Sequence, residues 1–355
     1  MTIFIVGALP GGGPRCARDP GYRRLSAVSL LRERLTRQLD HVNQRKQISL
    51  DENDMGTRAT KKISERVVFA ATTDSYSHAG VLFEPEGERA RTLVIWLHGI
   101  HLQFCEPEYV AIGRAVAGPR VAFLTANTRG HDFGAWMRGE NGLKLAGSGW
   151  ELLHECPADL EGWLRFAEAE GYGNVVLAGH GFGGSKIIHH LSSRNEPMVR
   201  GIILASCASI VRDLLKPEYH ALAKRMVEEG RGTDLLPWGA RPGVIPSTVS
   251  AQVLVARERL HHDLYGDGQQ PPALTRIRVP LIAWFGEKEV RVGQDNQQLL
   301  HSTAQNLTAC PLVETKLLPG VTYLYTGVED VIAKEILQWV GRVSPSGKAK
   351  RTSRP

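Results

Sequence analysis

Residues 174–193 read NVVLAGHGFGGSKIIHHLSS: an apolar run, then a cluster of glycines, then a helical pattern. A strand, a tight turn and a helix in this order are typical of two kinds of site. One is the nucleophile elbow G-x-S-x-G, whose strained turn holds a serine above a sheet and whose next backbone amide helps to form an oxyanion hole. The other is a dinucleotide-binding turn, because Gly179, Gly181 and Gly184 match its G-x-G-x-x-G pattern.

The dinucleotide interpretation is disfavoured by the next strand. Such a site needs an Asp or Glu at the end of that strand to bind the ribose. Here the stretch RGIILASCASI (200–210) offers Ser206 and Cys207 instead. A P-loop is excluded as well, because GHGFGGSK (179–186) ends in Ser-Lys where that motif requires Lys followed by Ser or Thr. The pattern therefore favours the elbow.

The wider pattern predicts an α/β fold with a mostly parallel central sheet and helices on both faces, because short apolar runs alternate with longer helical patterns. A helix is expected at 157–170, where Pro157 suits the first turn. At about 211–270 helical pieces and Gly/Pro-rich turns interrupt the alternation, which predicts an inserted helical cap. Strands are predicted at 66–72, 92–97, 120–125, 174–178, 200–205, 279–285 and 312–317.

These features resemble the α/β-hydrolase superfamily, and within it the cap-bearing hydrolases of small acylated metabolites, including siderophore esterases. The resemblance implies the α/β-hydrolase fold, with the backbone amides of Ile100 and Phe182 forming the oxyanion hole. It runs from about 65 to 343 and rests on LHG (97–99), NTRGHDFG (127–134), GHGFGG (179–184), WFGEKE (284–289) and PGVTYLYTG (319–327).

Two of the three triad positions implied by the resemblance are changed. Gly181 stands at the nucleophile position and has no side chain to attack a carbonyl. The family's histidine follows the last strand, where this chain has Tyr323, and the last histidine of the chain, His301, precedes that strand. The carboxylate position holds Glu289, with Glu287 as the neighbouring possibility. We therefore expect Glu289 and Tyr323 to be the catalytic candidates and the Ser-His-acid route to be lost.

Natural divergence accounts for both changes better than an inactivating substitution, which would explain Gly181 but not Tyr323. The backbone of an elbow nucleophile is strained by about 1–3 kcal/mol, and glycine adopts such conformations freely. Glycine is therefore favoured once nucleophilic attack is no longer needed.

Other polar side chains follow the predicted parallel strands, and the carboxyl ends of such strands are where α/β sheets bind ligands. His98 is expected to hold the oxyanion turn through hydrogen bonds. Cys207 could replace the nucleophile only with a nearby base. No His/Cys/Asp grouping has metal-ligand spacing, so neither a metal nor another cofactor is expected. The remaining candidates for substrate binding are His101, Cys105, His131 and His180.

The net charge of +6 is an effect of the two ends. Nine Lys/Arg face three acids in 1–46 and four more lie in 348–355, whereas 30 bases face 34 acids between 47 and 347. The middle of the chain is thus mildly acidic, which argues against a nucleic-acid partner. We expect a basic, disordered extension at 1–63, a hydrolase-fold domain at 64–343 and a basic disordered tail at 344–355.

No apolar run approaches the length of a membrane helix, and residues 3–9 are too few, without a preceding basic region, for a signal peptide. A transit peptide is the alternative for the Arg-rich stretch 22–46. Five cysteines without a CxxC pair suit a reducing compartment, so a cytoplasmic protein is expected.

The function we expect is binding of a small carbonyl-containing metabolite by a non-hydrolytic or atypical enzyme of a specialised biosynthetic pathway. Elimination, cyclisation, decarboxylation and addition all suit an oxyanion hole without a nucleophile. One alternative is a catalytically inactive pseudo-hydrolase that binds the small molecule. The other is an esterase or amidase with a relocated nucleophile. The sequence leaves the oligomeric state open.

Overall fold

The structure, a computed structural model, describes residues 62–87, 90–140, 142–207, 217–241, 247–257, 271–290 and 295–344. The chain divides into two compact units, Met1–Thr60 and Lys61–Pro355, and every described residue belongs to the second. Nearly all of the predicted extension and tail therefore lies outside the described residues.

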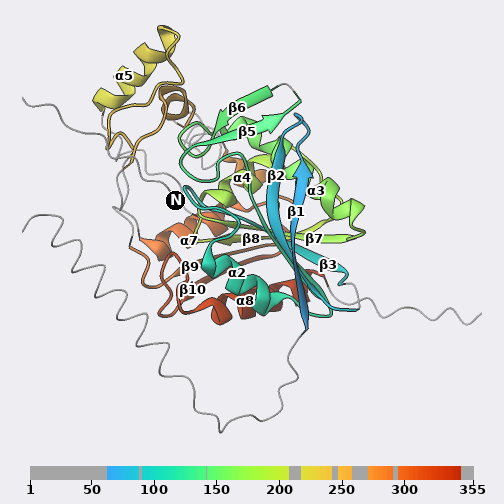
Figure 1. The fold of residues 1–355 in the computed structure, drawn as a ribbon. Coiled ribbons are helices and arrows are strands. Elements are labelled where there is room, and N and C mark those ends of the chain that lie inside the picture. The colour runs from blue at the N-terminus through green and yellow to red at the C-terminus, as the bar shows by residue number, and fades with distance from the viewer. Residues whose placement is uncertain are drawn as a thin grey trace, which may run out of the picture. The chain divides into compact units, whose positions relative to one another are not determined.

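The second unit is built on an eight-stranded sheet of order β1-β2-β4-β3-β7-β8-β9-β10 (Figure 1). β2 is antiparallel to both its neighbours, and from β4 to β10 every pairing is parallel. A separate hairpin pairs β5 with β6. The strands are β1 (Ile63–Ala71), β2 (Ser77–Pro85), β3 (Thr92–Leu97), β4 (Val121–Ala126), β5 (Ala135–Gly139), β6 (Gly142–Ala146), β7 (Asn174–His180), β8 (Val199–Ala205), β9 (Leu281–Gly286) and β10 (Val313–Leu318).

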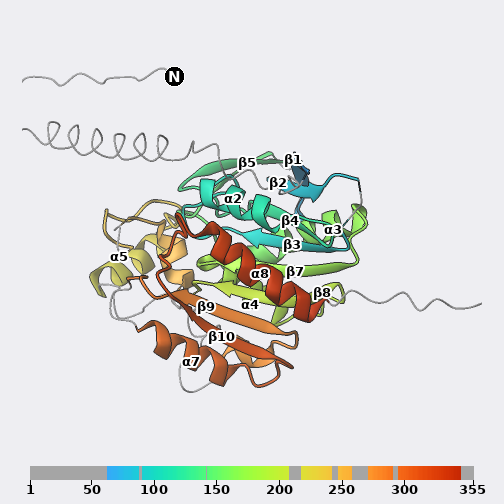
Figure 2. The same cartoon turned by 90° about the horizontal axis from the view of Figure 1, so that it is seen from below.

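Helices cover both faces of this sheet, and side chains alternate between two hydrophobic layers. In β3, Leu93, Ile95 and Leu97 point into one layer, whereas Val94 and Trp96 point into the other. α2 and α8 pack side by side on the Trp96 face (Figure 2), and α3, α4 and α7 cover the opposite face. The helices are α2 (Pro107–Val116), α3 (Cys156–Ala169), α4 (Phe182–Leu191), α5 (Pro217–Glu228), α7 (Asn296–Asn306) and α8 (Glu329–Val343), with 3-10 turns at Leu153–Glu155 and Ala273–Arg276.

The predicted sheet is confirmed, and all seven predicted strands are present with ends within three residues of those expected. The helix expected at 157–170 is α3. β2 and the β5–β6 hairpin were not predicted. In β2 the apolar pattern is broken by Gly80, where a Cβ would lie 2.5 Å from the carbonyl oxygen of Thr125 on the next strand. The close approach of the two strands requires glycine at this position. Because glycine interrupts the alternating apolar pattern, the sequence did not predict the strand.

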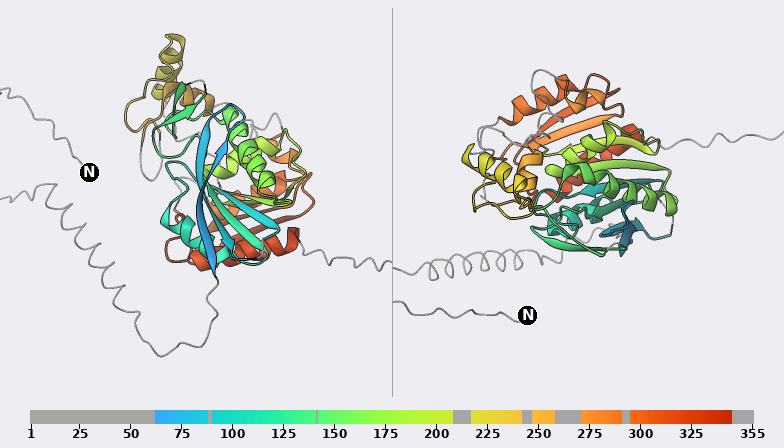
Figure 3. Two further views of the ribbon diagram at one scale, coloured as in Figure 1. Left: turned by 45° about the vertical axis from the view of Figure 1, so that its right-hand side comes forward. Right: turned by 90° about the horizontal axis from the view of Figure 1, so that it is seen from above.

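Part of the region predicted as a cap is described, namely 217–241 and 247–257, and we call it the inserted segment. It begins with α5 and has its own small core, which includes Met226, Leu236 and Leu254. Figure 3 shows α5 at one end of the unit, beyond the sheet. The Ser250 amide donates to the carbonyl of Gly149, 2.8 Å away, so the inserted segment is joined to the loop that follows β6.

Candidate active site

The turn after β7 has the backbone of an elbow although it carries no nucleophile. Gly181 has φ +53° and ψ −120°, a conformation that residues with a Cβ rarely adopt. The neighbouring glycines are required by close packing: a Cβ on Gly179 would lie 2.3 Å from the Gly184 amide, and one on Gly183 would lie 2.6 Å from the Leu97 carbonyl. The glycine cluster thus lets α4 begin directly against the end of β3.

The hydroxyl of Tyr323 occupies the space that a nucleophile would need. A Cβ built on Gly181 would lie 2.3 Å from the Tyr323 Oη, and a Cβ on Gly99 would lie 3.1 Å from the same atom. Tyr323 follows β10 and its side chain is half-buried. Gly181 and Tyr323, the residues expected at two of the triad positions, are therefore neighbours, and the phenol lies beside the place that a side chain at position 181 would occupy.

His180 lies beneath the elbow and holds Tyr323 in place. It is fully buried, its Nε2 donates to the backbone carbonyl of Tyr323 at 2.9 Å, and its Nδ1 accepts the hydroxyl of Tyr109 at 2.6 Å. The rings of His180 and Tyr323 pack with centroids 4.5 Å apart. Burial raises the pKa of Tyr109 well above its usual value, so its hydroxyl stays protonated and can donate. His180 thus contacts both the backbone and the ring of Tyr323.

At the acid position, Glu289 is the buried carboxylate. It accepts hydrogen bonds from the Gly286 amide at 2.6 Å and from the hydroxyl of Ser206. The Ser206 Oγ also lies 2.7 Å from the hydroxyl of Tyr325, whose pKa is raised by burial and by the nearby charge of Glu289. Glu287, the other sequence candidate, is exposed and accepts the amide of Gly320. Glu289 is therefore held in a polar network with Ser206 and Tyr325, where a triad acid would hold a histidine.

The two amides predicted as oxyanion donors belong to Ile100 and Phe182. Ile100 lies in the turn after β3, and Phe182 is the first residue of α4. In the part of the chain that the structure describes, neither amide donates a hydrogen bond to a protein group. Amides at a helix N-terminus and in a tight turn are suited to receive developing negative charge on an oxygen.

His98, expected from the sequence to hold the oxyanion turn, is hydrogen-bonded to the backbone on both sides of its ring. Its Nδ1 donates to the Gly99 carbonyl at 2.8 Å, and its Nε2 accepts the Thr128 amide at 3.1 Å. The Thr128 hydroxyl in turn accepts from Lys186, which forms an ion pair with Glu151 at 2.6 Å. Because Nε2 is an acceptor and the ring is buried, only the neutral imidazole fits. Burial, followed by the charge of Lys186, accordingly lowers the pKa of His98 well below 6.5.

Because the folded protein requires a neutral His98, we expect the free energy of unfolding to decrease at acidic pH. Unfolded His98 binds a proton below about pH 6.5 while the folded form stays neutral, so the stabilisation is complete above that pH and is lost as the pH falls. Between pH 7 and pH 5 the free energy of unfolding should decrease by about 2 kcal/mol more in the wild type than in His98→Asn. Chemical denaturation at both pH values measures this. His154→Gln, which changes an exposed histidine, should keep the wild-type difference; equal slopes for His98→Asn and wild type would contradict the assignment.

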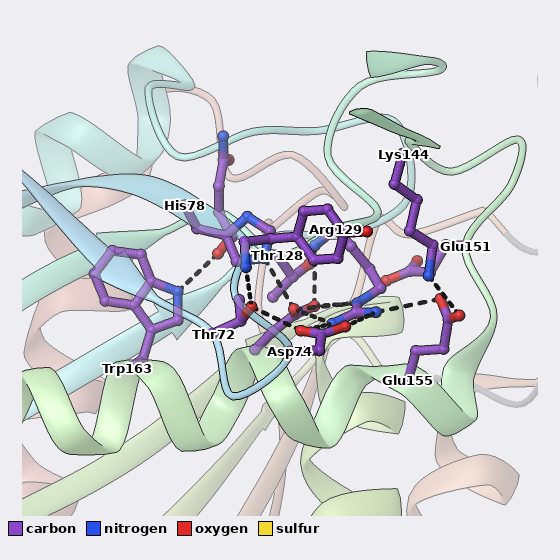
Figure 4. Close-up of polar contacts among 12 residues, drawn as sticks. Thr72, Asp74, His78, Thr128, Arg129, Lys144, Glu151, Glu155 and Trp163 are labelled. Atoms are coloured by element: carbon purple, nitrogen blue, oxygen red, sulfur yellow. Dashed lines mark hydrogen bonds and ion pairs between the residues drawn. The ribbon is translucent and has the colours of Figure 1, made fainter. Parts of the chain in front are cut away.

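Arg129, beside Thr128, is buried and anchors the loop after β4 through ion pairs with three carboxylates (Figure 4). Its guanidinium lies 2.8 Å from Asp159 of α3, and further contacts reach Asp74 and Glu155. His78 lies 2.8 Å from the same Asp159 carboxylate. Because the Thr128 amide donates to the ring of His98, this network is linked to the turn after β3.

Of three other sequence candidates, Cys105 and His131 both lie near Asp132, whereas Cys207 has different neighbours. Cys105 is exposed, and partial burial with the nearby Glu106 and Asp132 raises the pKa of its thiol, which disfavours a nucleophilic thiolate. His131 pairs with Asp132 at 2.8 Å. Cys207 is buried, with its sulfur 4.0 Å from the Ser185 hydroxyl.

His101 is hydrogen-bonded to Arg241, a residue that the sequence did not identify as part of the site. Its Nδ1 lies 2.6 Å from the Ser148 hydroxyl, and its Nε2 accepts from Arg241 of the inserted segment at 3.2 Å. Burial, then the charges of Arg241 and Arg257, lowers the pKa of His101 to about 4, so it is neutral at pH 7. No periodicity or spacing links these arginines to His101, since they are more than 100 residues away and act through tertiary contact alone.

The described residues contain no group of three or more His, Cys, Asp or Glu side chains placed to hold a metal ion. None of the helices in these segments is both long and apolar enough to cross a membrane.

The strand order, the elbow after β7 and the groups at the carboxyl ends of the strands define the α/β-hydrolase fold. No protein-family model and no curated protein matches the chain in sequence. Among solved structures it is similar to Est1E from Butyrivibrio proteoclasticus with ferulic acid bound, at 15% identity and a TM-score of 0.55 over 78% of this chain and 98% of that one.

Two further solved structures are similar over nearly their whole lengths. The esterase domain of a Rhodothermus marinus protein shares 18% identity with a TM-score of 0.51, covering 79% of this chain and 98% of that one. The α/β hydrolase GrgF from Penicillium sp. sh18 shares 15% identity with a TM-score of 0.54, covering 79% and 99%. At these identities the likeness establishes the fold.

Proposed function

We propose that this protein binds a small carbonyl-containing metabolite at the elbow and acts on it without an acyl-enzyme, as an atypical enzyme of a specialised biosynthetic pathway in the cytoplasm. The observation that carries the proposal is the Tyr323 hydroxyl lying where the nucleophile of a hydrolase would be, 2.3 Å from a Cβ on Gly181. A proton donor replaces a nucleophile at that point.

The chemistry follows from the groups around that hydroxyl. A carbonyl oxygen directed at the amides of Ile100 and Phe182 would gain stabilisation as it becomes an enolate or alkoxide, and one such donor is worth about 3–4 kcal/mol in hydrolases. Tyr323 would donate or remove the proton that this change requires. Elimination, cyclisation, decarboxylation and addition share these needs, and none requires a covalent intermediate.

His180 and Glu289 serve the proposal as positioning residues. His180 bonds the backbone of Tyr323, and Glu289 fixes Ser206 and, through it, Tyr325. The imidazole of His180 thereby holds Tyr323, whereas the carboxylate of Glu289 is engaged with Ser206 and does not activate a serine at position 181.

Two other functions are alternatives to this proposal. A pseudo-hydrolase would use the same contacts to bind a ligand without turnover. A hydrolase with a relocated nucleophile would need a base beside Cys207 or Cys105. The raised thiol pKa of Cys105 disfavours the second alternative at that residue.

The test is Tyr323→Phe, which removes the hydroxyl and keeps the ring packed on His180. Ligand affinity should stay within about tenfold, whereas turnover should fall by about 10²-fold or more, because only the proton transfer is lost. Ligands are first identified by mass spectrometry of small molecules retained by the protein purified from its host, and then assayed for binding and turnover.

Tyr172→Phe is the matched control, because the Tyr172 hydroxyl bonds Glu84 at 2.5 Å, away from the elbow. It should leave turnover unchanged. Full turnover in Tyr323→Phe would refute the acid–base role, and an absence of turnover in the wild type with tight binding would favour the pseudo-hydrolase.

A further inference from the structure

Two arginines of the inserted segment reach the elbow region; Arg257 is buried and Arg241 is half-buried. Arg257 is only 8% exposed; its Nη2 donates to the Ser148 carbonyl at 3.3 Å, and its guanidinium carbon lies 5.4 Å from the centre of the Phe182 ring. Arg241 donates to the Ser247 hydroxyl at 3.1 Å and to His101. Both guanidiniums therefore lie beside groups of the candidate active site.

Neither guanidinium has a carboxylate partner among the described residues. The bonded groups are neutral: a backbone carbonyl, a serine hydroxyl and a histidine that is uncharged at pH 7. The nearby Glu151 is already paired with Lys186 at 2.6 Å. In addition, the Nε of Arg257 is buried without a hydrogen-bond partner. Among the described residues, Arg257 and Lys186 thus share the charge of the single carboxylate of Glu151, and Arg241 has no carboxylate partner.

Such an arrangement is costly without a ligand. A buried charge needs a counter-charge, and a buried donor needs an acceptor. Burial and the like charge of Arg241 lower the pKa of Arg257 to about 9, which expresses the same cost. An oxyanion held by both guanidiniums would supply the missing charge and the missing acceptor together, and Arg is well suited to bind carboxylate or phosphate.

We propose that Arg241 and Arg257 form an anion-binding subsite, so that the ligand of this protein carries a carboxylate or phosphate group in addition to its carbonyl. The position follows from two contacts: Arg257 packs on the ring of Phe182, whose amide is the proposed oxyanion donor, and Arg241 donates to His101, the residue after Ile100. The ligand class is an oxo acid or a phosphorylated carbonyl compound. This inference rests on the proposed function for the carbonyl end of the ligand.

The experiment compares anionic carbonyl compounds with neutral partners of the same skeleton by titration calorimetry. The carboxylate probes are pyruvate, acetoacetate and levulinate, each paired with its methyl ester, and the phosphate probe is dihydroxyacetone phosphate, paired with dihydroxyacetone. The charged member of at least one pair should bind at least tenfold more tightly, and the pair that shows this identifies carboxylate or phosphate as the group bound.

Arg241→Gln and Arg257→Gln should each reduce that preference about tenfold or more, because a charge-assisted hydrogen bond is lost. The matched control is Arg231→Gln, in the same segment, whose side chain is 48% exposed and pairs with Glu229. It should keep the wild-type preference. Arg257→Lys retains the charge and should retain part of the preference, which covers the case in which Arg257→Gln does not fold.

Failure of this inference is distinguishable from failure of the proposed function. Equal binding of charged and neutral members, or no binding of any pair at about 10 mM, would overturn the anion subsite. If the neutral esters alone bind and Tyr323→Phe still reduces turnover, the proposed function is supported and the anion-binding subsite is wrong. If the anions bind through both arginines but Tyr323→Phe leaves turnover intact, the subsite stands and the acid–base role is wrong.

Discussion

Gly181→Ser alone is expected to destabilise the protein by about 3 kcal/mol and to produce no esterase. The new Cβ would lie 2.3 Å from the Tyr323 hydroxyl, so the phenol or the turn must move. Overpacking of this kind costs about 1–3 kcal/mol. The positive φ of +53° adds strain of about 1–3 kcal/mol for a residue with a Cβ. Denaturant unfolding measures the loss of stability, and hydrolysis of activated acyl esters measures the activity.

Gly230→Ser is the matched control, because it separates the cost of backbone strain from the cost of the steric clash with Tyr323. Gly230 has a φ of +75°, and a Cβ there would meet nothing within 4 Å. Gly230→Ser should therefore cost only the strain, about 1 kcal/mol. Equal costs at Gly181 and Gly230 would contradict the contact between Tyr323 and the elbow.

The double variant Gly181→Ser with Tyr323→His should recover part of the lost stability and show weak esterase activity. The imidazole frees the space beside the turn and restores a base, while the amides of Ile100 and Phe182 remain. A fluorophosphonate probe should label the double variant at position 181 and leave the wild type unlabelled. Rates should be poor, since Glu289 is bonded to Ser206 and a serine needs its base within about 3 Å. Labelling of the wild type would show that another nucleophile exists.

The sheet could be predicted because its strands carry the signal in their own residues. β3 and β9 are uninterrupted apolar runs, as expected for parallel strands covered on both faces. The hairpin of β5 and β6 has exposed side chains such as Trp136 and Leu143, so its pattern does not distinguish it from a loop. Its structure depends on pairing, which no short window of sequence reveals.

The candidate site was predictable only where a residue has a fixed place in the fold. Gly181, Tyr323 and Glu289 follow particular strands, so the resemblance could assign them as expected triad positions. The bond from His180 to the Tyr323 backbone and the contact of Arg241 with His101 join segments more than 100 residues apart. Such contacts are set by tertiary packing and leave no periodic trace.

The support beneath the oxyanion turn depends most on Asp159, which is fully buried on α3. Its carboxylate accepts from the Arg129 amide at 3.0 Å and from the Arg129 guanidinium, and it pairs with His78 at 2.8 Å. Burial alone would raise the pKa of Asp159, but His78 and Arg129 outweigh burial and lower it below its usual value. The ionised carboxylate is therefore the form that the folded protein requires.

Asp159→Asn is accordingly expected to reduce the free energy of unfolding by about 3–5 kcal/mol, because it leaves the buried Arg129 without its main counter-charge. Glu161→Gln, on the same helix, breaks a partly exposed pair with Arg194 and should cost at most about 1 kcal/mol. Because the folded-state pKa of Asp159 is lowered, its stabilisation is present above about pH 4 and is lost as the pH falls further. Denaturant unfolding at pH 7 and near pH 3 should therefore show a smaller acid-induced loss in Asp159→Asn than in the wild type. A cost at pH 7 no larger than that of Glu161→Gln would mean that Arg129 is held by Asp74 and Glu155, and that the oxyanion turn does not depend on α3.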